Sequence, residues 1–175
     1  YKSPVKERPY RPSDDASNCG NQTTTHCRFS TPTPAKEVGI LEMTPMKLAY
    51  TIIYVPDVPA SLAFCEAAFG LTRKFLHESG TYGELATGDT TLSFAAHALG
   101  DMNFSGGHVH ADTSAQPLGF EIGLVTDDVP QAHARALAAG AREMAPPVQK
   151  PWGQTVSYLR CPDGLLVELC TAVGG

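Results

Sequence analysis

The chain has 175 residues, of which 42% are hydrophobic and 18% are charged, and these values suit one globular domain. Its formal net charge of −5 argues against a broad basic surface for nucleic acid. No run approaches the roughly 18 apolar residues of a membrane span, and no apolar stretch follows a basic start, as in a signal peptide. We therefore expect a cytoplasmic protein that binds neither nucleic acid nor membranes.

Residues 1–45 are predicted to form a flexible leader. Prolines recur there among Ser, Thr, Asn, Asp and Lys, and the segment has neither a helical nor a strand period. Met43 and Met46 stand directly before the first regular segment, so upstream or non-native sequence is one interpretation of the leader. An interaction arm is the other, and the residues do not decide between them. Residues 173–175 are predicted to be a short tail.

The five cysteines do not indicate a disulfide framework, because their number is odd and their spacing is irregular. Cys65, Cys161 and Cys170 lie in periodic apolar segments, where a thiol usually packs as a small hydrophobic group. Cys19 and Cys27 lie in the leader, and a disulfide between them is the less favoured alternative.

The regular part of the chain begins with a predicted strand and helix. Residues 48–55 are rich in β-branched and aromatic side chains, which is typical of a strand. Asp57 can cap the following helix, and Pro59 suits its first turn because it has no amide hydrogen to lose. Gly70 suits the left-handed residue after the helix. Three short strands are predicted next, at 71–77, 82–87 and 90–96, with a hairpin turn at 87–89.

Residues 97–118 are rich in Gly, His, Asp and Ser and are predicted to be a linking loop. His108 and His110 lie in this loop, where both rings could meet a metal ion. Surface histidines without a ligand are the favoured interpretation.

The tripeptide Asp57-Val58-Pro59 returns as Asp128-Val129-Pro130, and the elements around it return as well. We predict a strand at 119–125, a helix that stops at Gly140, and strands at 142–145, 155–160 and 165–170 with a turn at 162–164. Self-similarity at a fixed offset is the signature of a repeated structural unit. The chain is therefore predicted to hold two βαβββ modules, at 46–97 and 118–172, within a single domain at 46–172.

Side chains alternate between the two faces of a strand, and this alternation separates a core face from an open face. In the first strand Ile53 and Val55 belong to the aliphatic set that packs under the helix, which leaves Tyr50 on the other face. Glu121 is equivalent to Tyr50 in the second module, and Glu168 lies on the open face of the last strand. A carboxylate inside an apolar strand is costly unless it is paired or bound. The alternative for each glutamate is an orientation toward solvent.

The residues from about 46 to 172 resemble the vicinal-oxygen-chelate superfamily, which includes glyoxalases, bleomycin-resistance proteins and extradiol dioxygenases. The resemblance rests on the opening segments 50–58 and 62–71, and more specifically on the closing segments 151–154 and 161–169. It implies an α+β fold in which the two modules form a curved eight-stranded cup around the ligand, with the helices on its outer face. It also implies a homodimer. Whether the cup forms within one chain or across a swapped dimer stays open.

Metal-using members of the family place one ligand on the first and last strand of each module. The resemblance carries these places onto Tyr50, Ser93, Glu121 and Glu168, of which only the glutamates could serve readily. Two carboxylates with two hydroxyl groups would bind a divalent ion weakly. We therefore expect no metal and no other cofactor, with a divalent ion as the disfavoured alternative.

The favoured function is binding or sequestration of a small molecule, independent of metal, as in the bleomycin-resistance-like members. One alternative is a metal-dependent lyase, isomerase or dioxygenase with an atypical site around Glu121, Glu168 and His97. Another is a metal-free enzyme that uses Glu168 or His97 as its general base. The sequence specifies neither the ligand nor any catalytic residue. The candidate ligand-binding residues are Tyr50, Tyr54, Ser93, His97, Glu121, Trp152 and Glu168.

Overall fold

The computed structural model describes residues 45–174, and Thr44–Gly175 form one compact unit. The predicted leader lies outside the described residues, apart from Pro45 at its end. Among the described residues, no helix is both long and apolar enough to cross a membrane.

The first module is a four-stranded sheet with a helix against one face. Strand β1 lies parallel to β4, and β4, β3 and β2 follow as antiparallel neighbours, in the order β1-β4-β3-β2. The elements are β1 (Tyr50–Val55), α1 (Val58–Phe69), β2 (Thr72–Leu76), β3 (Tyr82–Ala86) and β4 (Thr91–Ala96).

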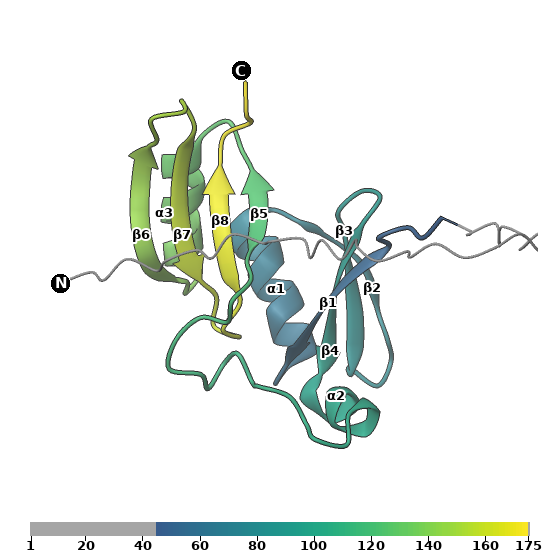
Figure 1. The fold of residues 1–175 in the computed structure, drawn as a ribbon. Helices are drawn as coiled ribbons and strands as arrows, with labels where there is room; N and C mark the ends of the chain where they lie inside the picture. Colours follow the sequence, from purple (N-terminus) through teal and green to yellow (C-terminus); the bar gives the residue numbers. More distant parts are fainter. Residues whose placement is uncertain (1–44, 175) are drawn as a thin grey trace, which may run out of the picture. The chain divides into compact units, whose positions relative to one another are not determined.

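The second module repeats this arrangement with the order β5-β8-β7-β6 (Figure 1). Its elements are β5 (Ile122–Val125), α3 (Val129–Ala138), β6 (Arg142–Gln149), β7 (Thr155–Arg160) and β8 (Leu166–Cys170). Strand β6 is longer than predicted and runs through two prolines, with register shifts along its pairing with β7. It is an edge strand, where proline is tolerated because one side needs no ladder donor. The α+β fold with two βαβββ modules is confirmed.

The repeated Asp-Val-Pro tripeptide begins both long helices, as predicted. Asp57 Oδ1 accepts a hydrogen bond from the Ala60 amide at 2.9 Å, and Asp128 Oδ1 accepts one from the Gln131 amide at 2.9 Å. Each carboxylate thus satisfies an amide that has no partner within its helix. Gly70 follows α1 with φ of 69°, the left-handed conformation predicted for it.

One hydrophobic core serves both modules. Ile53 and Val55 of β1 are buried in it together with Leu62 of α1, and Leu159 and Val167 bring the second sheet into the same cluster. Helix α1 packs against α3, and Arg135 Nε of α3 donates a hydrogen bond to the Ala68 carbonyl of α1 at 2.7 Å. The core side of each sheet is therefore the side that its helix covers.

The eight strands form two separate sheets of four, and the sheets do not close on each other within the chain. The modules instead meet through their helices and through a buried hydrogen bond from Ser61 Oγ of α1 to Asp163 Oδ2, 2.7 Å long, in the β7–β8 turn. Each sheet consequently keeps one face that neither long helix of residues 45–174 covers, and these two surfaces are called the open faces below.

A short helix, α2 (His97–Asn103), replaces the first part of the predicted linking loop. His97 therefore begins a helix instead of continuing the face of the preceding strand. No side chain caps α2, but Gly100 is buried so closely that a Cβ there would lie 2.7 Å from Cε1 of His108. Contact with the linker positions this helix, which is why local sequence signals did not predict it.

Candidate functional site

The open face of the first sheet holds a tyrosine and a carboxylate in mutual contact. Tyr82 Oη lies 3.1 Å from both Glu84 Oε1 and Ser93 Oγ, and Lys74 Nζ lies 2.8 Å from Glu84 Oε2. The hydrogen bond from Lys74 is the main reason that the pKa of Glu84 is lowered. The pKa of Tyr82 is raised mainly by burial. Glu84 is therefore an ionised group held in place by its neighbours.

The open face of the second sheet carries a second such pair. Tyr158 Oη of β7 donates a hydrogen bond to Glu168 Oε2 of β8 at 3.1 Å. Glu121 lies near them at the start of β5, and its pKa is raised by partial burial and then by the hydrogen bond and repulsion of Glu168. The pKa of Tyr158 is raised by burial and by both glutamates. This face concentrates negative charge without an opposing cation among these contacts.

Strand register places the carboxylate on a different strand in each module, and Tyr82 shares β3 with Glu84. Glu84 of β3 lies opposite Ser93 of β4, whereas Tyr158 of β7 lies opposite Glu168 of β8. The first module therefore has its carboxylate on the third strand and its hydroxyl on the fourth, and the second module has the reverse. Glu84 was missed in the sequence, although it shows the signal that revealed Glu168, a glutamate inside an otherwise apolar strand.

The predicted ligand-binding residues divide between the two sheets. Tyr50 and Ser93 lie on the open face of the first sheet, and Glu121 and Glu168 are brought together on that of the second. Trp152 lies apart from both pairs, in the exposed β6–β7 turn, and its Nε1 donates to Gln154 Oε1 at 2.9 Å. The structure brings no residue of the first group against the second within one chain.

Tyr54 and His97 lie at the end of the first open face, where α2 sits. The ring of Tyr54 packs on His108 with a centroid distance of 4.9 Å, and on Phe104 at 5.8 Å. His97 Nδ1 is 2.8 Å from His108 Nε2. His108 and His110, predicted to be surface histidines, are both half-buried, with His108 against Tyr54 of β1 and His110 against His97 of α2.

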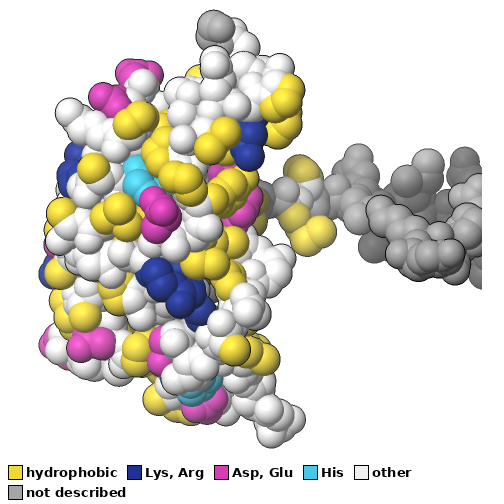
Figure 2. Space-filling view, turned by 90° about the vertical axis from the view of Figure 1, so that its left-hand side faces the viewer, with side chains coloured by type: hydrophobic (Ala, Val, Ile, Leu, Met, Phe, Trp, Pro, Cys, Tyr) yellow, Lys and Arg dark blue, Asp and Glu magenta, His cyan; other side chains and the backbone are white. Residues whose placement is uncertain are grey.

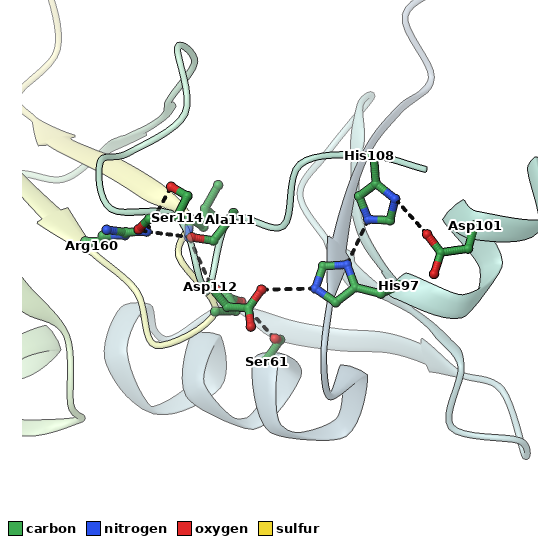
Figure 3. A network of polar contacts seen from close by, with 10 residues as sticks. Ser61, His97, Asp101, His108, Ala111, Asp112, Ser114 and Arg160 are labelled. Atoms are coloured by element: carbon green, nitrogen blue, oxygen red, sulfur yellow. Dashed lines mark hydrogen bonds and ion pairs between the residues drawn. The ribbon is translucent and has the colours of Figure 1, made fainter. Parts of the chain in front are cut away.

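The linker is fixed on its other side by Arg160 of β7. Its Nη2 donates hydrogen bonds to the carbonyl oxygens of Ala111 at 2.5 Å and Ser114 at 2.8 Å, as Figure 3 shows. Arg160 is buried, so these carbonyl groups supply the polar partners that a desolvated guanidinium requires. The segment between His108 and Ser114 is therefore anchored to both modules.

A cavity of about 520 Å³ lies elsewhere, beside α1, and is lined mainly by Ala, Pro and Phe64. Its two carboxylates are already engaged, since Asp57 caps α1 and Asp163 accepts from Ser61 and from the Leu165 amide. A ligand site needs placed polar groups that are free to orient the ligand. We therefore place the candidate site on the open faces.

Figure 2 shows the side of the molecule on which β6 and α3 lie, where hydrophobic side chains reach the surface among charged ones.

Comparison with known proteins identifies the family. The family model described as "Glyoxalase/Bleomycin resistance protein/Dioxygenase superfamily" matches residues 47–169. No significant match was found among curated proteins.

Several solved structures share the fold. A glyoxalase-related enzyme from Fulvimarina pelagi is 19% identical with a TM-score of 0.63, covering 73% of this chain and 89% of its own. A family enzyme from Burkholderia phytofirmans PsJN is 22% identical with a TM-score of 0.60, covering 72% and 98%. A superfamily member from Sphaerobacter thermophilus DSM 20745 is 20% identical with a TM-score of 0.57, covering 73% and 98%. Together with the paired βαβββ modules, the match of the family model shows that the chain belongs to the glyoxalase/bleomycin resistance protein/dioxygenase superfamily.

Proposed function

We propose that the protein binds and sequesters a small cationic or hydrogen-bond-donating molecule in a cup between two open faces. One face is the first-module sheet of one copy of the chain, and the other is the second-module sheet of a second copy. The observation that carries this proposal is that both sheets keep an open face with a tyrosine–carboxylate pair, while the sheets do not close within one chain.

The charge of these faces favours a cation. Glu121 and Glu168 contribute two carboxyl groups, and Glu84 adds a third whose charge Lys74 offsets. Ligand pockets combine apolar walls with a few placed polar groups. Tyr50, with 52% of its surface exposed, offers an aromatic wall on which a cation can rest.

The proposed site works without a metal ion at its strand positions. Ser93, which is fully buried, already contacts Tyr82, and Glu168 is held by Tyr158. A divalent ion between the sheets would find the Ser93 hydroxyl already engaged and one carboxylate oxygen of Glu168 already shared with Tyr158. A cluster of several free His or carboxylate ligands, which a catalytic metal of this kind prefers, is absent from the described open faces.

A second copy of the chain is proposed to cover the apolar part of the open faces. Ile52 and Val125 lie on the two faces with 45% and 66% of their surface exposed, and Val148 adds an exposed side chain opposite Val156. Apolar surface of this kind on a sheet usually marks an interface. Because the sheets of one chain do not meet, covering both faces requires two copies related by twofold symmetry.

Ligand binding tests the first part of the proposal. We expect a panel of small cations, metal-free bleomycin among them, to raise the melting temperature where anions of matched size do not. Glu168→Gln should weaken the affinity of any binding cation about 10- to 100-fold, since it removes a charge-assisted contact. Glu78→Gln, which removes an exposed charge in the β2–β3 turn, is the matched control. Preference for anions, or equal affinity in both variants, would contradict the proposal. A divalent ion that binds once per chain and is lost in Glu168→Gln would instead indicate a metal-dependent member.

The oligomeric state tests the second part. We expect a dimer by light scattering, and Ile52→Asp or Val125→Asp should weaken dimerisation about 100-fold or more because a charge would be buried without a partner. Val173→Asp, an exposed position near the end of the chain, should leave the dimer intact. A monomeric protein that still binds the ligand with full affinity would rule out a shared cup.

A further inference from the structure

We propose that His97, His108 and His110 form a binding site for a divalent transition metal ion of the zinc class, separate from the open faces. One ligand nitrogen from each ring lies within 4.8 Å of the others. His97 begins α2, whereas His108 and His110 belong to the linker between the modules, so the ion would join the linker to the first module.

The two closest rings each turn one nitrogen toward the other. His97 Nε2 lies 3.1 Å from Asp112 Oδ1, so its N–H points at that carboxylate and leaves Nδ1 as the free acceptor. His108 Nδ1 lies 3.4 Å from Asp101 Oδ1 but makes no hydrogen bond, so the sole proton of a neutral His108 can stand on either ring nitrogen. His97 Nδ1 and His108 Nε2 face each other at 2.8 Å, as Figure 3 shows. A proton between these two nitrogens makes a hydrogen bond, and a metal ion that replaces this proton would be bound by both rings.

Aspartates behind the ligand nitrogens are the usual arrangement of a histidine metal site. Metal-bound histidines almost always donate their other N–H to a carboxylate or carbonyl, which fixes the tautomer and the ring orientation. Asp112 has this role for His97, and Asp101 lies in the corresponding place beside His108. The rings of Tyr54 and Phe104 pack against His108 and limit the access of water. The cluster therefore has two oriented ligands in a partly apolar surrounding.

The third ligand completes the site by a rotation of its ring. The His110 ring is stacked on His97, with the centroids 3.6 Å apart and the planes 1° from parallel. An ion in the plane of one ring cannot lie in the plane of a parallel ring at that distance, so His110 must turn to bind. Zn–N bonds are about 2.0–2.1 Å long, which places tetrahedral ligands about 3.3 Å apart. The spacing of His97 and His108 then has to open only slightly.

The chemistry of the donors selects the metal. Three imidazoles suit Zn²⁺, Co²⁺, Ni²⁺ or Cu²⁺, whereas Mg²⁺ and Ca²⁺ prefer an all-oxygen environment. Binding of such an ion would also stabilise the folded chain, because the unfolded chain has no preformed site. The ion would thus hold the segment that Arg160 anchors on its other side.

Zinc titration of the full-length chain tests the site. Cys19→Ser and Cys27→Ser are introduced together as the background, so that thiols of the leader do not compete for zinc. After treatment with a chelator, we expect one Zn²⁺ per chain by calorimetry and a higher melting temperature with zinc. We also expect Co²⁺ to give the visible absorption of a tetrahedral nitrogen site. His108→Gln should weaken Zn²⁺ about 100-fold or more, and Asp112→Asn should weaken it about 10- to 100-fold by releasing the orientation of His97. His77→Gln is the control, because this exposed histidine has its ring beside Ser79 and Phe75, away from the cluster.

The outcomes separate this site from the open faces. Loss of zinc affinity in His108→Gln with retention in His77→Gln and Glu168→Gln supports the proposal. Equal affinity in the parent protein and in these three variants, no saturable binding, or loss in Glu168→Gln alone overturns it. If His108→Gln does not fold by circular dichroism, His110→Gln at the half-buried third ligand takes its place, with the same two outcomes.

Discussion

Repulsion between Glu121 and Glu168 lowers the stability of the folded chain at neutral pH, although both carboxyl groups belong to the proposed ligand site. Their carboxyl groups lie on one open face, and desolvation with mutual repulsion raises the pKa of Glu121 above its ordinary value of 4.5. The folded chain therefore holds a proton on Glu121 more tightly than the unfolded chain does. The resulting stabilisation is complete below pH 4.5 and is lost as the pH rises through the raised pKa.

Glu168→Gln should remove this repulsion. We expect the variant to gain melting temperature relative to the natural chain as the pH rises from 4 to about 7, with a gain in free energy of unfolding below about 1 kcal/mol because the pair is largely exposed to solvent. Thermal denaturation across this pH range measures the effect. For Glu78→Gln, the difference in melting temperature from the natural chain should not change with pH. If this difference changes with pH equally in both variants, Glu168 is not the source of the repulsion.

The core thiols are a second feature of single residues. Burial, followed by the charge of Asp163, raises the pKa of Cys65 to about 12, and burial raises that of Cys161 as well. Since the thiolate is the reactive form, we expect both to resist alkylation at pH 8 until the chain is unfolded. The folded protein is treated with iodoacetamide, and mass spectrometry of its peptides measures the alkylation of each cysteine. Modification at the rate of a free thiol would refute the expectation.

At the level of elements, the β7–β8 turn joins the second sheet to the linker. Gly164 has φ of 87°, and a Cβ there would overlap the carbonyl group of Ala111. The turn also brings Asp163 to Ser61 of α1. One tight turn thus meets α1 on one side and the inter-module linker on the other.

Gly164→Ala should destabilise the protein by about 2–5 kcal/mol, through left-handed backbone strain and overlap with the linker. Gly88→Ala isolates the first contribution, because Gly88 has a similar φ of 85° and no heavy atom near the added Cβ. It should cost only about 1–3 kcal/mol. Chemical denaturation compares the two, and equal losses would mean that the linker yields freely.

At the level of the whole molecule, the modules are coupled by one core and by two hydrogen bonds, one between α3 and α1 and one between α1 and the β7–β8 turn. Leu62 of α1 is fully buried in a cluster that includes Leu159 and Val167 of the second sheet. The modules should therefore unfold in one transition instead of two.

Leu62→Ala should lower the free energy of unfolding by about 2–5 kcal/mol. We expect amides of β4 and β8 to lose protection together when the variant is followed by hydrogen exchange and mass spectrometry. Phe75→Ala, at a half-exposed position on β2, is a control that should cost much less. Continued protection of β8 after loss at β4 would show that the modules fold independently.

Part of the structure could be read from particular residues. The caps Asp57 and Asp128, the terminal Gly70 and the alternation along β1 act within a few residues, so local pattern was enough to predict the elements they control. The same alternation placed Glu121 and Glu168 on one face. It did not predict α2, because Gly100 and His108 hold that helix by a contact between segments.

The sequence by itself therefore determined the repeated module, its helix caps and which side chains each strand turns away from its helix, since these depend on neighbouring residues. Only the tertiary structure decided that the helices pack together and leave two open faces, that Tyr82 meets Ser93, and that His97 meets His108 and His110. These contacts join segments that are distant in the sequence. Neither the alternation along one strand nor the spacing of nearby residues therefore predicts them.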